Sequence, residues 1–429
     1  MAHFGISLIY SLPISAKFCS KIHFSLHKLR TFNMSKSLGL KTRSTRLISS
    51  LSILTLAISL TACGSGTPDT TASPGASPEG TTTEASPSPE TTAAAPMEKP
   101  LLKGNVALTG AGASFPAPLY QNWFVQLNKE VPELQVNYQS VGSGAGVEQF
   151  TGGTVDFGAS DVAMKDEEIA KVKKGVLMLP MAAGSIVMAY NLPGVQGLKL
   201  SREVYVGIFD GSITKWNDPK IAAVNPDLKL PDQPITVIHR SDGSGTTGVF
   251  TKHMSAISKD WEKAIGQGKS VQWPTSKGKF IGGKGNEGVT AAIQQNQGSI
   301  GYVEYGYAKN NGLTMASLEN AAGKYVEAND TTASATLDAV TLPENLREFI
   351  TDPQGEGSYP IVTYTWLLVP KTFDDPQKAI AMEAMIQYGL TKGQEQSAAL
   401  GYVPLPMSVK EKVAAAADTI SPDYQIKLK

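Results

Sequence analysis

Beyond residue 100, short apolar runs alternate with segments in which apolar residues recur at helical spacing. The segment VALTGAGASF (106–115) predicts a strand that ends in a turn, and Leu119 and Trp123 then fall on one face of a helix. Pro116 or Pro118 suits the first turn of that helix, because the N–H that proline lacks would have no partner there.

The same alternation continues toward the end of the chain. It predicts α/β layers, because consecutive strands and helices of this kind pack as a sheet covered by helices. Further strands are predicted at 134–141, 155–161, 184–192, 235–240 and 363–370, and further helices at 144–153, 246–258 and 379–393; residues 202–218 predict a helix and a turn, and residues 289–308 a helix, a turn and a strand.

The N-terminal region has a different pattern. Residues 48–60 form an apolar run of the length of a signal peptide's hydrophobic region, and Lys36, Lys41, Arg43 and Arg46 precede it. The run is too short to cross a bilayer as a mature helix. Met34 would give a signal of conventional length, so we expect translation to start there.

This run ends in Leu60-Thr61-Ala62-Cys63, which resembles the lipobox of bacterial lipoproteins. The resemblance implies cleavage before Cys63 and acylation of that residue, with two or three acyl chains holding the chain on a membrane. We therefore expect residues 1–63 to be a signal segment with a lipobox. An uncleaved N-terminal anchor and an ordinary signal peptide are the alternatives.

Residues 64–99 are rich in Ser, Thr, Pro, Ala and Gly and contain almost no large apolar side chain. Such a segment buries too little surface to offset the entropy lost on ordering. We expect a disordered tether between the lipid anchor and the folded domain.

Composition narrows the possible functions. The formal net charge is zero, and the basic residues form no stripe, so nucleic acid is not an expected partner. Both cysteines, Cys19 and Cys63, precede the folded region, which excludes a disulfide framework. No metal and no cofactor is expected, because the five histidines show no metal-ligand spacing; they are His3, His23, His27, His239 and His253.

Five short segments rich in Gly and Ser are the most informative feature of the chain. Small residues let backbone N–H groups approach a ligand closely, and hydroxyls at helix starts bind an anion without a net cation. One segment adds an Arg and two add an Asp, which predicts a site for a small oxyanion that still carries a proton. The segments are GAGASFPAP (110–118), VGSGAG (141–146), DFGASD (156–161), RSDGSGTTG (240–248) and GGKGNEG (282–288).

Two segments resemble nucleotide-binding motifs, and we reject both as nucleotide-binding sites. GSGTTG (243–248) fits the G-x-G-x-x-G pattern, with Asp260 at a tolerable distance, but Arg240 and Asp242 crowd the turn and the export signal argues against a cytosolic dinucleotide. GKFIGGK (278–284) is close to a P-loop, but Gly285 stands where that loop needs a Ser or Thr for Mg²⁺.

Taken in order, these segments closely resemble the phosphate-binding protein of the bacterial phosphate-specific ABC transporter, the PstS family. The matching stretches are GAGASFPAPLY, VNYQSVGSGAGVEQF, TVDFGASD, HRSDGSGTTGVFT, GGKGNEGV and GSIGYVEYGYAK, and the resemblance runs from about residue 104 to near the C-terminus. It implies a two-lobed α/β fold of the periplasmic-binding-protein type (type II), with the ligand cleft between the lobes. Lobe one would comprise 104–180 plus 362–429, and lobe two 181–361.

The resemblance also implies a set of phosphate contacts, with Asp242 orienting Arg240. Ser114 stands where the family often has Thr, which retains the hydroxyl. In GGKGNEG we expect Lys284 and Asn286 only to support the turn. The implied contacts are Ser114, the backbone N–H of Phe115, Ser143, Asp161, Arg240, Ser244, the Gly245 backbone and Thr246.

Physical chemistry supports these contacts but leaves alternatives. The Ser and Thr residues lie where a strand turns into a helix, and there they could equally be ordinary N-caps. Arg240 offers a planar fork for two oxygens, or a salt bridge. Asp242 either holds Arg240 or caps the following helix.

Asp161 would decide which oxyanion binds. An ionised carboxylate only accepts hydrogen bonds, so it pairs with the O–H of hydrogen phosphate and leaves sulfate facing an unpaired like charge. The alternative is that Asp161 caps a helix. Asp161→Asn should weaken the discrimination against sulfate.

The expected function is capture of inorganic phosphate and its delivery to the permease subunits of an ABC importer, without catalysis. The receptor is expected to be a monomer held by its lipid anchor on the outer face of the cytoplasmic membrane. A secreted phosphatase-like enzyme, or a phosphate sensor or scavenger without a transporter, remains as an alternative.

Overall fold

The computed structural model describes residues 99–429. The predicted signal segment 1–63, Cys63 and all but the last residue of the predicted tether 64–99 lie outside the described residues. Within the described part of the chain, no helix is long and apolar enough to cross a bilayer.

Three parallel strands begin the fold. They are β1 (Val106–Gly112), β2 (Leu134–Ser140) and β3 (Phe157–Ser160), in the spatial order β2-β1-β3. Helix α1 (Ala117–Glu130) connects β1 to β2, and α2 (Ser143–Thr151) connects β2 to β3. We call these three strands with their helices the first half-sheet, and their positions agree with the strands and helices expected from the pattern.

A second set of strands repeats this topology. It consists of β6 (Thr236–Arg240), β7 (Lys279–Gly283) and β8 (Ser299–Glu304), which are parallel and ordered β7-β6-β8. Helices α6 (Gly245–Ile257) and α7 (Lys259–Ala264) connect β6 to β7, and α8 (Gly285–Gln295) connects β7 to β8. We call this set the second half-sheet. In each set the second strand lies on one side of the first and the third strand on the other, an arrangement that places ligands at the carboxyl ends of the strands.

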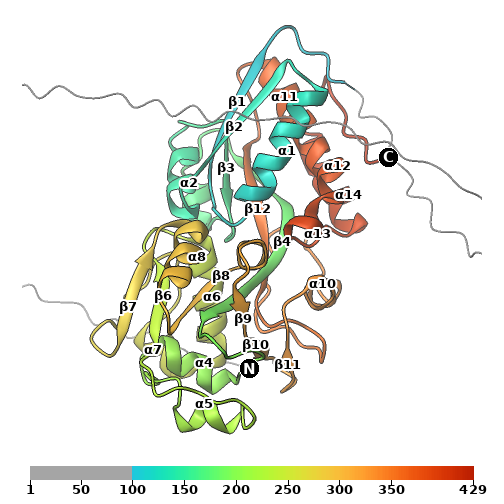
Figure 1. The fold of residues 1–429 in the computed structure, drawn as a ribbon. Coiled ribbons are helices and arrows are strands. Elements are labelled where there is room, and N and C mark those ends of the chain that lie inside the picture. The colour runs from blue at the N-terminus through green and yellow to red at the C-terminus, as the bar shows by residue number, and fades with distance from the viewer. Residues whose placement is uncertain (1–98) are drawn as a thin grey trace, which may run out of the picture. The chain divides into compact units, whose positions relative to one another are not determined.

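Two long strands join the half-sheets (Figure 1). Strand β4 (Val176–Asn191) pairs with β12 (Val362–Pro370) through residues 176–185 and with β8 through residues 186–191. Strand β12 in turn pairs with β3. The full order is β2-β1-β3-β12-β4-β8-β6-β7, with β9 (Thr314–Met315) paired to β4.

Strand β4 is longer than the sequence predicts, because the expected strand, 184–192, covers only its second half. Residues 176–183 include Pro180, which normally argues against a central strand because it has no N–H to donate. The register with β12 shifts between Thr365 and Trp366, opposite Pro180 and Ala182, and this irregularity accommodates the proline.

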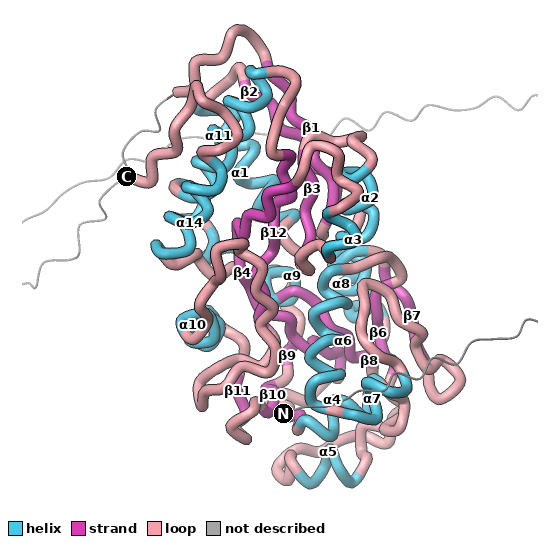
Figure 2. Tube along the Cα trace, turned by 180° about the vertical axis from the view of Figure 1, so that it is seen from behind, coloured by secondary structure: helices cyan, strands magenta, loops and turns pink. Residues whose placement is uncertain are grey.

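Helices and small strands complete the described part of the chain (Figure 2). Helix α1 packs on its predicted apolar face, and it contacts α11 (Pro376–Leu390) beside the first half-sheet. The remaining elements are α3 (Asp166–Ile169), β5 (Lys199–Leu200), α4 (Arg202–Phe209), α5 (Pro219–Ala223), α9 (Tyr305–Asn310), β10 (Ser317–Glu319), β11 (Tyr325–Val326), α10 (Asp330–Asp338), α11 (Pro376–Leu390), α12 (Lys392–Glu395), α13 (Ser397–Leu400) and α14 (Met407–Ala417).

Tryptophan side chains contribute to the packing of the described residues. Trp216, Trp261 and Trp366 are buried. Trp273 is half-buried and stacks on His239 with ring centroids 5.1 Å apart, so His239 also points into packing rather than into the ligand cleft.

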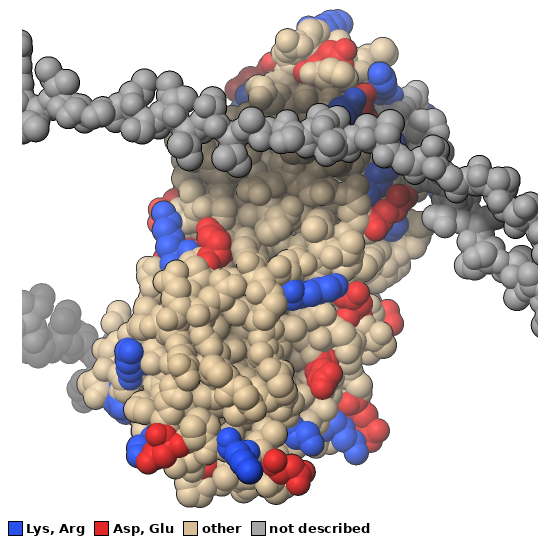
Figure 3. Space-filling view, viewed as in Figure 1, with Lys and Arg blue, Asp and Glu red and all other residues tan. Residues whose placement is uncertain are grey.

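Charged side chains of both signs are interspersed on the face shown in Figure 3, around a broad area that carries few charges. This face shows no basic stripe of the kind that follows a nucleic-acid backbone.

Candidate functional site

The residues singled out in the sequence meet where the carboxyl ends of the two half-sheets face each other. Ser114 follows β1, Ser143 begins α2 and Asp161 follows β3. From the second half-sheet, Arg240 ends β6 and the first turn of α6 comes next. The two sides touch directly, because Gly144 N donates to Gly243 O at 2.8 Å.

All of these residues are buried. Their exposed fractions are at most a few per cent, although their side chains are mostly polar, so they need partners that water does not supply. The buried set is Ser114, Phe115, Ser143, Asp161, Arg240, Ser244, Gly245 and Thr246.

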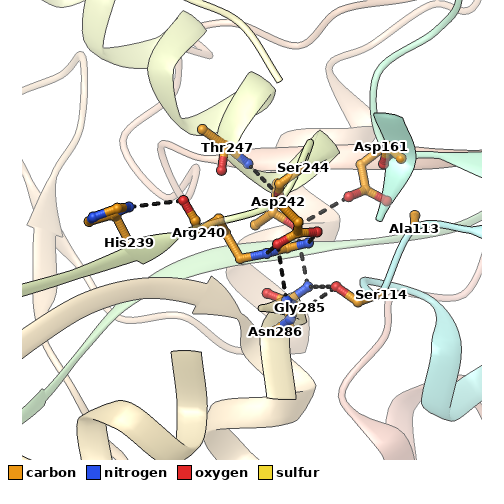
Figure 4. Close-up of polar contacts among 12 residues, drawn as sticks. Ala113, Ser114, Asp161, His239, Arg240, Asp242, Ser244, Thr247, Gly285 and Asn286 are labelled. Carbon is orange, nitrogen blue, oxygen red and sulfur yellow. Dashed lines mark hydrogen bonds and ion pairs between the residues drawn. The ribbon is translucent and has the colours of Figure 1, made fainter. Parts of the chain in front are cut away.

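Asp242 holds the guanidinium of Arg240 through two bonds (Figure 4). Arg240 Nε donates to Asp242 Oδ1 at 2.7 Å and Nη2 donates to Oδ2 at 2.6 Å. Gly285 N donates to the same Oδ1 at 3.1 Å. Helix α6 is capped by Ser244, whose Oγ accepts from Thr247 N at 3.0 Å. Of the two roles left open for Asp242, the geometry shows the pairing with Arg240.

The charges of this pair stabilise each other. Burial lowers the pKa of Arg240, but the bonds to Asp242 and its charge outweigh burial and hold that pKa above its ordinary range. Burial likewise raises the pKa of Asp242, and the bond and charge of Arg240 outweigh it, so the pKa of Asp242 is lowered. Both side chains are therefore ionised near neutral pH.

One nitrogen of Arg240 has no hydrogen-bond partner in the described part of the chain. Asp242 occupies the Nε–Nη2 edge, and the buried Nη1 atom forms no hydrogen bond within residues 99–429. A buried, unpaired nitrogen of a cation is costly, and an oxyanion at the free edge of the guanidinium would satisfy it.

Asp161 is the buried acceptor of the site. Its Oδ1 accepts from Thr365 Oγ1 at 3.0 Å and its Oδ2 from Thr246 Oγ1 at 3.2 Å, while Ser143 Oγ accepts from its backbone N–H at 3.3 Å. Burial raises the pKa of Asp161 to about 6, against the opposing effects of the Thr365 bond, the Arg240 charge and the Thr246 bonds.

Three tyrosines fix the loop that follows β1. Tyr138 OH donates to Ala113 O at 2.7 Å, Tyr307 OH to Ser114 O at 2.8 Å and Tyr402 OH to Phe115 O at 2.7 Å. In a trans peptide the N–H points opposite to the preceding carbonyl. Holding the Ser114 carbonyl therefore also fixes the direction of the Phe115 N–H, the backbone donor that the family resemblance implies.

Sequence reasoning missed Asn286. It was expected only to support a turn, yet it is fully buried and donates to Ser114 Oγ from both its backbone N and its side-chain Nδ2, at 3.0 Å each. Asn286 is in the first turn of the helix after β7, as Ser143 is in the helix after β2. The repeated topology was the signal that could have found it.

Sequence reasoning also missed Thr365, which donates to Asp161 Oδ1 from β12. Lys284 stands at the N-cap of α8, but its side chain does not cap the helix. Within residues 99–429, no group of three or more His, Cys, Asp or Glu side chains is placed to hold a metal ion.

Two facing βαβαβ half-sheets, crossed by two strands and closing on a buried polar site, define a solute-binding protein of the periplasmic-binding-protein class. A family model described as a PBP superfamily domain matches residues 72–392. The phosphate-binding protein PstS of Haemophilus influenzae is 44% identical over 307 residues, which cover 71% of this chain and 90% of that protein. PstS of Methanocaldococcus jannaschii is 38% identical over 334 residues, covering 73% and 85%. The chain belongs to the PstS family.

Solved structures agree on the fold. A phosphate-binding protein from Stenotrophomonas maltophilia superposes with a TM-score of 0.58 at 20% identity, covering 72% of this chain and 93% of that one. A putative phosphate ABC transporter substrate-binding protein from Clostridium perfringens, with bound phosphate, gives 0.52 at 16% identity, covering 70% and 100%. These likenesses support the expected α/β fold of the periplasmic-binding-protein type, which is confirmed.

Proposed function

We propose that this chain binds inorganic phosphate in the buried site and delivers it to an ABC-type phosphate importer. The observation that carries the proposal is that two groups lie in one site: the buried Arg240 Nη1, which has no hydrogen-bond partner within residues 99–429, and the buried acceptor Asp161. The Arg240 guanidinium favours an anionic ligand. The Asp161 carboxylate only accepts hydrogen bonds, so that anion must carry a proton. Hydrogen phosphate meets both needs. The PstS relatives are named for phosphate binding.

The proposed contacts divide into donors and acceptors. The hydroxyls of Ser114, Ser143 and Ser244, the backbone N–H groups of Phe115 and Gly245 and the free edge of Arg240 donate to the ligand. Asp161 accepts the O–H of the ligand, and Thr246 Oγ1, whose hydrogen goes to Asp161, contacts the ligand through a lone pair. The hydroxyl and backbone N–H donors come from the starts of α1, α2 and α6, where the helix dipole adds partial positive charge.

We further propose that residues 104–180 with 362–429 form one lobe and residues 181–361 the other. The lobes would close on phosphate by hinge motion in the connecting strands β4 and β12, a known form of domain closure. The direct contact between Gly144 and Gly243 is that of a closed cleft.

The proposed role is binding rather than catalysis. A phosphatase would have to activate a nucleophile or a metal-bound water, and its turnover would respond to chelation. Incubation of the purified chain with a chromogenic phosphate ester should release no product, with or without added divalent metal. Release of product would favour the enzyme alternative.

Transport would need the chain to be held at the outer face of the cytoplasmic membrane, which we propose occurs through acylated Cys63. Cys63→Ser should move the chain from the membrane fraction to the soluble fraction without changing phosphate affinity. Phosphate uptake that is unchanged in cells lacking the protein would instead favour a sensor or scavenger.

Equilibrium dialysis against phosphate tests the proposed site, because the chain contains a matched control. Arg202 makes a similar two-bond pair with Asp352, at 2.9 and 2.8 Å, outside the site. Arg240→Ala should weaken phosphate binding by at least about 100-fold, since charged hydrogen bonds each contribute roughly 1.5–3 kcal/mol. Arg202→Ala should bind like the wild type. Equal binding by Arg240→Ala would reject the site.

A further inference from the structure

Asn286 joins the two half-sheets inside the site. It belongs to α8 of the second half-sheet and is fully buried. Its partner Ser114 follows β1 of the first half-sheet, 172 residues away in the chain. Figure 4 shows Asn286 and Ser114 side by side, near the Arg240–Asp242 pair.

The orientation of the Asn286 amide is determined by its neighbours. Glu304 N donates to Asn286 Oδ1 at 3.1 Å, and a backbone N–H can only donate, so the oxygen of the amide must face Glu304. The Nδ2 group then faces the opposite side, where its two hydrogens go to Ser114 Oγ at 3.0 Å and to Thr246 Oγ1 at 3.3 Å.

These bonds determine the role of the Ser114 hydroxyl. A serine oxygen has two lone pairs and one hydrogen. Ser114 Oγ accepts from both Asn286 N and Asn286 Nδ2, which uses both lone pairs. Neither of these two bonds uses the hydrogen of Ser114 itself, so the hydroxyl is left as a donor.

Thr246 is oriented in the same way. Its Oγ1 accepts from Asn286 Nδ2 and donates to Asp161 Oδ2 at 3.2 Å. One lone pair of Thr246 and the Asp161 carboxylate remain to accept the proton of a ligand. Ser114 donates to another oxygen of that ligand.

We propose that Asn286 is a positioning residue that orients the Ser114 hydroxyl as an obligatory donor to the bound oxyanion. Because the two residues belong to different half-sheets, this orientation exists only when the halves are together, so closure itself prepares the donor. The inference rests on the proposed phosphate site and adds a residue that acts through Ser114 rather than by touching the ligand.

A double-mutant cycle measured by calorimetric titration with inorganic phosphate tests the proposal on the full chain. Asn286→Ala and Ser114→Ala should each weaken binding by roughly 10-fold or more, as expected for loss of a buried hydrogen bond. In the Ser114→Ala background, the fold-change in phosphate affinity caused by Asn286→Ala should be at least fivefold smaller than in the wild-type background. An equal effect of Asn286→Ala in both backgrounds, or no effect, would overturn the proposal.

A buried asparagine elsewhere controls for loss of folding. Asn225 is 5% exposed and bonds to the backbone of Lys199 and Ile221, so Asn225→Ala should lower the melting temperature but keep phosphate affinity within about twofold. Failure of the wild type itself to bind phosphate would reject the proposed function, and this result is distinct from a cycle that shows no coupling.

Asn286→Asp keeps the shape of the side chain and supplies a second test if the alanine variant does not fold. The new carboxylate cannot donate, so Ser114 would donate to it and turn away from the ligand. Relative to the wild type at the same pH, which corrects for the titration of Asp161, phosphate binding should be weakened more than 10-fold at pH 8 and less at pH 5, where protonation of the new carboxyl restores a donor. Binding equal to that of the wild type at pH 8 would overturn the proposal.

Discussion

At the scale of single residues, one edge of the Arg240 guanidinium forms hydrogen bonds with Asp242, and the other edge is left for a ligand. Asp242 neutralises one edge of Arg240, and the buried Nη1 has no partner among the described residues. Asp161 faces this region as a buried carboxyl whose pKa is raised to about 6 by burial. Such an arrangement costs stability in the absence of ligand, which is a common property of binding sites.

The raised pKa of Asp161 predicts how the stability of the ligand-free chain depends on pH. Below the ordinary value of 3.8 the carboxyl is protonated in both the folded and the unfolded states, and ionisation adds no penalty. As pH rises from 3.8 to about 6, the unfolded chain ionises first, so the free energy of unfolding falls and then levels off.

Asp161→Asn should remove this penalty. At pH 7 the variant should be more stable than the wild type by on the order of 3 kcal/mol, because each pKa unit corresponds to about 1.4 kcal/mol. The gain should shrink toward pH 4. Urea unfolding of the phosphate-free proteins at several pH values measures it, and a variant that is less stable at pH 7 would contradict this account of Asp161.

At the scale of elements, the first half-sheet depends on a very close approach of helix α2. A Cβ atom added at Gly146 would lie 2.4 Å from Gly112 Cα and 2.8 Å from Ala111 O. Both neighbours are strand backbone, which cannot move without disturbing β1 and its pairing with β3. Gly146, the last glycine in VGSGAG, therefore sets the distance between α2 and the sheet and thus the position of Ser143.

Gly146→Ala should be destabilising by about 3 kcal/mol, near the upper end for overpacking of a rigid site. Gly357→Ala is the matched control, because a Cβ there meets no atom within 4 Å and the residue is exposed. Chemical denaturation of both variants measures the difference. Equal stability of the two would show that α2 can shift.

Elements with local signals could be predicted, and residues defined by distant contacts could not. The strands of the first four Gly-rich segments, the apolar face of α1 and the start of α6 all follow from patterns within a few residues. Strand β7, which leads into GGKGNEG, was not predicted. The first half of β4 was missed because Pro180 interrupts it, and the register shift that tolerates this proline depends on β12. Asn286 was missed because its partner Ser114 lies 172 residues away.

The family resemblance supplied the role of Asp242, which local reasoning left open. Its position two residues after Arg240 and two before Ser244 is compatible with either pairing or capping. Only the geometry distinguishes the two, since Ser244 itself accepts from Thr247 N.

At the scale of the whole folded part, polar contacts hold the two proposed lobes together in the closed form. Lys269 Nζ pairs with Glu168 Oε1 at 3.0 Å, and Arg347 Nη1 pairs with Asp166 Oδ1 at 2.7 Å. Each pair joins residues from different proposed lobes. The apparent affinity for ligand includes the cost of closure, so contacts that favour the closed form should tighten binding without touching phosphate.

Lys269→Ala should weaken phosphate binding by roughly two- to fivefold at low salt, with a smaller effect at high salt, as expected for a partly exposed ion pair. Lys259→Ala serves as the control, because Lys259 pairs with Glu262 inside α7 and not across the cleft. Titrations at two ionic strengths compare them. Identical affinities for both variants would mean that the Lys269–Glu168 pair does not contribute to closure.

Calorimetric titration of the purified chain with phosphate and then with sulfate, in phosphate-depleted buffer, tests the central claim most directly. An enclosed site with one free guanidinium edge and a buried carboxylate acceptor predicts tight one-to-one binding of phosphate and no heat with sulfate. Absence of phosphate binding, or equal binding of sulfate, would contradict the assignment of Arg240 and Asp161 to a protonated oxyanion.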